Sequence, residues 1–148
     1  MLYINFINTI MWQKSYSIKV KNVTPESIWA IWSDFSKRKL WDDDIDWLEA
    51  KGSFAKGAKF TFKPLKGPKV KMEISECIPN KVFTDCSKLM AARLYGIHEM
   101  EMQGEELCLN TTIKITGPLA WLWGKFLGEA IFKSLPHQTD LLIKLANS

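Results

Sequence analysis

The chain has 148 residues, of which 47% are hydrophobic and 12% aromatic, and its formal net charge is +4. This composition excludes a disordered chain and allows one domain with a substantial buried core. The modest positive charge does not call for a nucleic-acid partner. The 7 tryptophans are numerous enough to line an apolar cavity as well as to fill a core.

The first ten residues are apolar, but they lack the basic start and the small-residue cleavage site of a signal peptide. They are also too few to span a bilayer. Regular patterning begins near Trp12. We therefore expect residues 1–11 to form an N-terminal extension and residues 12–148 to form a single domain.

The next part of the chain predicts one strand and two helices. Residues 15–20 alternate between apolar and polar side chains, as a strand does. Thr24 and Pro25 then form a helix start, with Thr as the cap and Pro at the first helical position. This start predicts a helix over residues 25–35, and a second short helix follows over residues 37–42.

Six strand-like segments separated by turn residues come next. We expect them over residues 46–51, 58–63, 69–78, 81–88, 93–103 and 106–116. If Gly104-Glu105 is a two-residue hairpin turn, Gln103 pairs with Glu106. In that register His98 shares the apolar face with Met100 and Leu109, so His98 is predicted to point inward.

Residues 118–145 predict one long, very apolar helix. Lys125, Glu129 and Lys133 lie four apart and form a narrow charged stripe. Gly124 and Gly128 each cost about 1 kcal/mol in a helix interior, so we expect the sheet or a ligand to approach them closely. A proline in a helix interior costs about 3 kcal/mol, and Pro136 is therefore predicted to end or kink the first part of the helix.

A series of short motifs runs through this pattern. They are Thr24-Pro25-Glu26-Ser27-Ile28-Trp29, Ser33-Asp34, Trp41-Asp42, Gly52-Ser53-Phe54 with Gly57, Ile78-Pro79 with Phe83, and Gly117-Pro118-Leu119-Ala120 with a helix that reaches Leu135-Pro136. In order and spacing they resemble the START-like (SRPBCC) superfamily, and within it the polyketide cyclase/dehydrase-like group. The resemblance covers nearly everything after Trp12.

The resemblance implies the α+β helix-grip fold. In that fold a curved antiparallel sheet of about seven strands wraps around a long C-terminal helix, and two short helices follow the first strand. It also implies an apolar cavity between sheet and helix. Members bind lipids, sterols, hormones or polyketides, and some act on them, but they share no universal catalytic motif.

The leading prediction is therefore a protein that binds a small hydrophobic molecule in this cavity, without a cofactor. His98 is the predicted polar anchor. The predicted lining residues share the inner faces of the strands and of the final helix: Phe60, Phe62, Met72, Ile74, Met100, Phe126, Leu127 and Ile131.

Two other functions remain open. In the first, a cyclase, aromatase or dehydratase uses His98 as acid or base, assisted by Asp85 or Tyr95. Asp85 shares the parity of Phe83 and would be buried with a raised pKa, or it would pair with a lysine near a strand end. Arg93 lies near a strand end and could reach the cavity mouth. In the second, the cavity is closed and the protein is a non-catalytic interaction module.

No metal site is expected. Asp42, Asp44 and Asp46 have the spacing of the first ligands in a calcium loop, but Trp47 and Ser53 stand where that loop needs Gly and Glu. His137 has no partner at metal-binding spacing.

Cysteine and lysine positions carry two weaker predictions. The cysteines at 77, 86 and 108 show no CxxC spacing, and we expect buried, reduced thiols in a cytoplasmic protein. The lysines at 51, 56, 59, 63, 66, 69 and 71 are typical of the wet face of a sheet. Transient contact of these lysines with an anionic membrane surface is the alternative.

Overall fold

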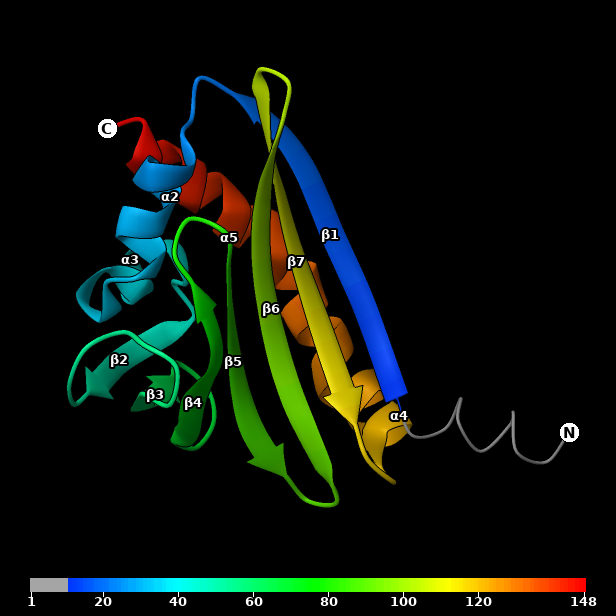
Figure 1. Cartoon of the computed structure of the whole chain (residues 1–148). Coiled ribbons are helices and arrows are strands. Elements are labelled where there is room, and N and C mark those ends of the chain that lie inside the picture. Colours follow the sequence, from blue (N-terminus) through cyan, green and yellow to red (C-terminus); the bar gives the residue numbers. More distant parts are fainter. Residues whose placement is uncertain (1–10) are drawn as a thin grey trace, which may run out of the picture.

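The computed structural model describes residues 11–148, and the prediction for residues 1–10 lies outside this part of the chain. Seven antiparallel strands form one sheet in the order β1-β7-β6-β5-β4-β3-β2. The strands are β1 (Met11–Lys21), β2 (Ile45–Ala50), β3 (Lys59–Pro64), β4 (Val70–Ile78), β5 (Val82–Leu89), β6 (Ala92–Gln103) and β7 (Glu106–Thr116). The α+β class and the strand order along the chain are confirmed (Figure 1).

Short helices connect β1 to β2. They are α2 (Pro25–Trp32), the 3-10 turn η1 (Phe35–Lys37) and α3 (Arg38–Trp41). The Ser27 N–H donates to Thr24 Oγ1 over 3.1 Å, which caps α2 as predicted. The helix ends at Trp32 rather than at residue 35, because the Asp34 side chain accepts the Ser36 N–H over 3.0 Å and starts a new turn.

The β6–β7 hairpin has the register that its turn predicts. Gln103 lies opposite Glu106, and His98 lies opposite Thr111. His98 is buried on the concave face of the sheet, as predicted. Inward residues of the neighbouring strands continue this face, because Phe83 pairs with His98 and Ile18 pairs with Leu109.

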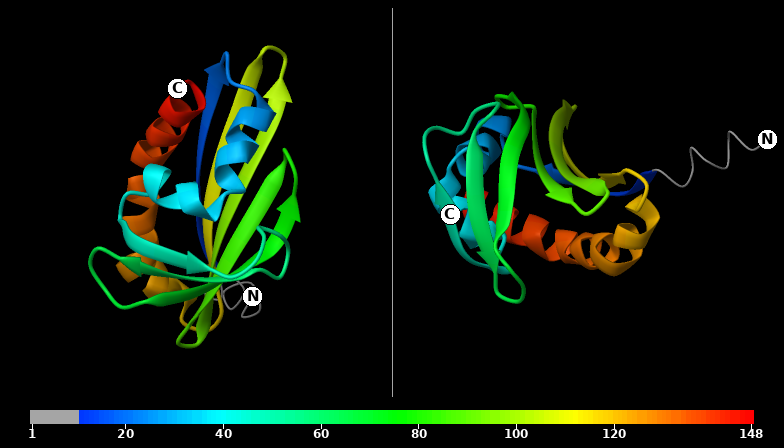
Figure 2. Two further views of the ribbon diagram at one scale, coloured as in Figure 1. Left: turned by 90° about the vertical axis from the view of Figure 1, so that its left-hand side faces the viewer. Right: turned by 90° about the horizontal axis from the view of Figure 1, so that it is seen from below.

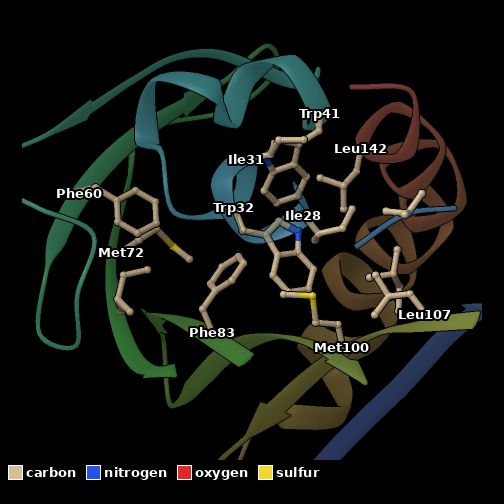
Figure 3. Packing of buried hydrophobic residues seen from close by; sticks show 13 residues of the cluster. Ile28, Ile31, Trp32, Trp41, Phe60, Met72, Phe83, Met100, Leu107 and Leu142 are labelled. Carbon is tan, nitrogen blue, oxygen red and sulfur yellow. The ribbon is translucent and has the colours of Figure 1, made fainter. Parts of the chain in front are cut away.

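The hydrophobic core fills the concave face of the sheet. Aromatic side chains dominate its centre, where Trp32 from α2 meets Phe83 from β5, with Trp41 from α3 and Phe60 from β3 farther out on either side (Figure 3). The helices α2 and α3 contact the C-terminal helix, so that helix and the short helices together cover the concave face (Figure 2). Burial of this apolar surface is the main favourable contribution to folding.

The C-terminal helix has three segments: α4 (Ala120–Trp123), the π-helical turn η2 (Gly124–Gly128) and α5 (Glu129–Ala146). The predicted close approach at Gly124 and Gly128 is confirmed, because a Cβ on either glycine would overlap the Trp12 ring of β1. The prediction that Pro136 ends the helix is wrong. Pro136 lies inside α5, which continues to Ala146.

Candidate functional site

His98 lies at the centre of a buried aromatic cage. Its ring stacks on Phe83 at a centroid distance of 4.3 Å and an interplanar angle of 11°. The rings of Trp32 and Trp41 meet it edge-on at 5.8 Å and 5.7 Å. Burial lowers the pKa of His98 well below its usual value, and the positive charge of Arg38 acts in the same direction. The imidazole is therefore neutral at neutral pH.

Beside the cage, three charged side chains form what we call the polar core: Arg38, Asp42 and Asp85. Arg38 Nη2 donates to Asp85 Oδ2 over 3.1 Å, and Arg38 Nε lies 3.5 Å from Asp42 Oδ2. The guanidinium also lies over the Trp41 ring at 4.6 Å. A single arginine from α3 thus holds one carboxylate of its own helix end and one of strand β5.

Burial raises the pKa of both carboxyl groups in the polar core. For Asp85 burial is the largest influence, and the ion pair and hydrogen bond with Arg38 oppose it. For Asp42 burial is again the largest influence, and the charge of Arg38 opposes it. Gly96 leaves room for Asp85, since a Cβ there would lie 2.7 Å from Asp85 Oδ1.

A small cavity adjoins His98. Its volume is about 10 Å³, which is room for a single water molecule. Its walls come from the short helices, strands β6 and β7, and α5: Trp32, Trp41, His98, Leu109, Thr111, Leu135, Gln138, Thr139 and Leu142. Among residues 11–148, the buried indole N–H groups of Trp32 and Trp41 have no hydrogen-bond acceptor.

A larger groove opens on the surface near the same cage. Its volume is about 690 Å³, and its walls are Ala30, Ser33, Asp34, Phe35, Ser36, Leu48, Ala50, Gly52, Ser53 and Phe54. Phe54 separates the groove from the interior: it meets Phe83 edge-on at 5.2 Å, and Phe83 in turn stacks on His98. Gly52 and Gly57, with φ of 88° and 90°, flank Phe54 in its loop.

No protein-family model matches the sequence, and no curated protein matches it. Solved structures do match. A hypothetical protein from Helicobacter pylori has a TM-score of 0.73 at 14% identity over 91% of this chain and 88% of that one. Norcoclaurine synthase from Thalictrum flavum, solved with dopamine and hydroxybenzaldehyde, has a TM-score of 0.71 at 14% identity over 96% and 90%. This chain has the helix-grip fold.

A third helix-grip neighbour is Ara h 8.0201, with a TM-score of 0.64 at 9% identity over 93% of this chain and all of that one, 100%. Likeness at such low identity shows the fold alone. Membership in the polyketide cyclase/dehydrase-like group stays a prediction.

The predicted site residues fall into different places in this helix-grip fold. Of the predicted ligand contacts, His98 lines the cavity. Phe60, Met72, Ile74 and Met100 are packed in the core, and Phe62 packs against it. Leu127 and Ile131 are half-buried on the C-terminal helix. The placement of Phe126 on the inner face is wrong, because its side chain is 71% exposed.

The residues of the enzyme alternative divide between the two faces of the sheet. Asp85 is buried as its parity predicts, but its partner is Arg38 rather than a lysine. Arg93 and Tyr95 have the opposite parity to His98 along β6, and Lys114 lies 6.0 Å from the Tyr95 ring on that outer face. His98 and Asp85 share the concave face, where a Cβ on Gly96 would lie 3.5 Å from His98 Nε2 and 2.7 Å from Asp85 Oδ1, but no hydrogen bond joins these two described side chains.

Sequence reasoning missed Arg38 and the polar wall from α5. Two signals were present. Arg38 and Asp42 lie four apart, which suits an ion pair along one turn. Thr139 falls between Leu135 and Leu142 at helical spacing, which predicts a polar side chain on the buried face of the helix.

The other sequence predictions concern cysteines, metals and membranes. Cys77, Cys86 and Cys108 are free and half-buried. Within residues 11–148, no three His, Cys, Asp or Glu side chains gather around a common metal position. In the same range no helix has the length and hydropathy needed to cross a membrane.

Proposed function

We propose that the protein binds a small hydrophobic molecule with at least one hydrogen-bond acceptor, in the space between the sheet and the C-terminal helix. The observation that carries this proposal is the pair of buried indole N–H groups, on Trp32 and Trp41, in the walls of one cavity. Buried donors are almost always paired, and leaving one unpaired costs about 1–3 kcal/mol. An acceptor atom from a ligand would satisfy them, and His98 supplies a further polar contact.

The cavity must widen to take an organic molecule, because its present volume holds one water. The groove offers a route. Displacement of Phe54 together with a shift of Phe83 would connect the groove to the His98 cage, because Phe54 meets Phe83 and Phe83 stacks on His98. The ligand would then touch predicted lining residues that now belong to the core or pack against it: Phe60, Phe62, Met72, Ile74 and Met100. We expect it to reach Leu127 and Ile131, which are half-buried on the C-terminal helix.

The neighbour norcoclaurine synthase was solved with dopamine and hydroxybenzaldehyde, so small phenolic amines and aldehydes are sensible first compounds to test. Fatty acids, sterols and aromatic polyketides complete the panel. The protein should also be purified from its own cells, because its location decides which metabolites it meets. That location is predicted to be cytoplasmic. Native mass spectrometry of that material would reveal a molecule that co-purifies.

Quenching of tryptophan fluorescence measures binding directly. We expect a hit to quench the wild-type protein, and we expect Trp32→Phe, which removes one donor but keeps an aromatic ring, to weaken its binding about five- to tenfold. Trp121→Phe is the matched control, because Trp121 is exposed and outside both cavity and groove. Equal weakening of binding by both variants would rule out this site. So would a panel in which no compound quenches the wild-type fluorescence.

The second candidate is an interaction module with a permanently packed interior. The small cavity volume favours it. Phe54→Ala separates the two functions, because removal of this ring should speed ligand binding if the groove is the route. A packed interaction module would bind no panel compound before or after the substitution.

A further inference from the structure

Large apolar side chains are exposed together at one end of the molecule. Met90 is 76% exposed, Trp121 54% and Phe126 71%. They belong to the β5–β6 turn, to α4 and to η2. Two hydrogen bonds hold these segments together: Trp123 Nε1 donates to the Met90 carbonyl over 2.9 Å, and the Leu119 N–H donates to the Ala91 carbonyl over 3.2 Å. Figure 1 shows α4 beside the start of β1 at this end.

The segments that build this end carry positive charge without negative charge, and Glu73 of β4, opposite Cys86, lies at its margin. Residues 86–98 and 111–128, which build it, contain Lys and Arg but neither Asp nor Glu. Lys88, Arg93 and Lys125 are exposed there. The nearest acid along the helix, Glu129, is paired with Lys14 at 2.8 Å. By contrast, the acids of the β6–β7 hairpin, at 99, 101, 105 and 106, lie toward its opposite end.

Exposed Trp, Phe and Met side chains beside unpaired lysines and arginines are suited to a bilayer interface. The apolar side chains enter the headgroup region while the cations contact anionic lipids. The chain before Met11 also contains no charged residue, and it joins the fold here, where Met11 pairs with Thr116 at the end of β7.

We propose that the end formed by Met90, Trp121 and Phe126, with Lys88, Arg93 and Lys125 around them, docks the protein on an anionic membrane surface. This surface is separate from the lysine-rich strands between residues 51 and 71. It is also separate from the cavity and the groove, so it does not depend on the proposed ligand. Its charge distribution would turn this end toward a negative surface before contact.

The test is co-sedimentation of the full chain with vesicles. We expect binding to vesicles of phosphatidylcholine mixed with phosphatidylserine, weaker binding to phosphatidylcholine alone, and release by high salt. The double variant Trp121→Ser/Phe126→Ser should bind at least about tenfold more weakly. Lys125→Glu should weaken binding to the anionic vesicles about tenfold, because it replaces an attraction with a repulsion.

Leu40→Ser is the matched control, since Leu40 on α3 is 54% exposed but lies outside this end of the molecule. It should bind vesicles as the wild type does. Circular dichroism confirms that each variant is folded. Wild-type protein that ignores anionic vesicles would overturn the proposal, as would a double variant that binds them undiminished. The surface would instead be a contact between copies if light scattering shows that the wild type is a dimer, that the double variant is a monomer, and that the dimer does not bind vesicles.

Discussion

The sheet is attached to its helices in two contrasting ways. At the polar core, Arg38 of α3 reaches Asp85 of β5, and the contact depends on buried charge. At the other end, Trp12 of β1 lies against Gly124 and Gly128 of the C-terminal helix, and the contact depends on shape. We call this second region the glycine contact.

The two contacts tolerate change differently. Removing one member of a buried ion pair leaves an uncompensated charge, which is costly wherever it occurs. A shape contact has no charge to expose, but any added atom must displace a packed ring. The polar core therefore fixes the orientation of α3 over the cage, while the glycine contact fixes how closely the helix approaches the edge of the sheet.

Breaking the polar core should have the largest effect. Arg38→Met leaves Asp85 and Asp42 buried without a cation, and we expect the free energy of unfolding to fall by about 3–5 kcal/mol. Urea denaturation at neutral pH measures the change. The control is Lys37→Met, which removes an exposed charge from the neighbouring position. A loss no greater than that of the control would mean that the folded protein already holds Asp85 protonated.

The glycine contact should be next in size. In Gly128→Ala the new Cβ overlaps Trp12, and we expect a loss of about 1–3 kcal/mol although alanine is the better helix former. At exposed Ala130 the reverse exchange, Ala130→Gly, should cost about 1 kcal/mol from helix propensity alone. Adding Trp12→Leu to Gly128→Ala should recover part of the loss. Full additivity of the two substitutions would contradict the contact.

The aromatic cage next to the polar core predicts a pH dependence. Because the folded-state pKa of His98 is lowered, the unfolded chain takes up a proton near pH 6.5 while the folded protein does not. The free energy of unfolding should therefore fall on acidification below about pH 6.5, by up to about 1.4 kcal/mol per pH unit.

His98→Gln isolates this contribution. The raised pKa values of Asp42, Asp85 and His137 act in the opposite direction, but they are present in both proteins and cancel in the difference. Thermal unfolding across the acidic range should show a steeper decline for the wild type. Parallel curves would indicate that the folded-state pKa of His98 is not lowered.

The smallest effect is expected at the surface beside the glycine contact. Lys14 Nζ lies 2.8 Å from Glu129 Oε1, but both side chains are partly exposed. Lys14→Met should change the free energy of unfolding by about 0–1 kcal/mol. The change should shrink at high salt, because salt screens an exposed ion pair. A larger loss would place this ion pair among the contacts that hold the helix.

Much of this architecture follows from local patterns. Strand periodicity and the Gly104-Glu105 turn predict the β6–β7 register, and that register alone puts His98 on the concave face. The two glycines in an apolar helix predict a close neighbour. Local rules could not place Phe126, because the π-helical turn from Gly124 to Gly128 is wider than an α-helical turn and shifts the faces that follow.

The sequence by itself determined the order of the strands and helices, the inward direction of His98, and the need for close approach at Gly124 and Gly128. These depend on short-range periodicity and turn chemistry. The helix-grip architecture was implied by the family resemblance, and the parity of Asp85 left its inward direction open. Only the tertiary structure decided that Arg38 pairs with Asp85, that the interior holds a cavity of about 10 Å³, and that Phe54 stands between it and the groove. Those features join residues far apart in the chain, and their distances depend on how the layers pack.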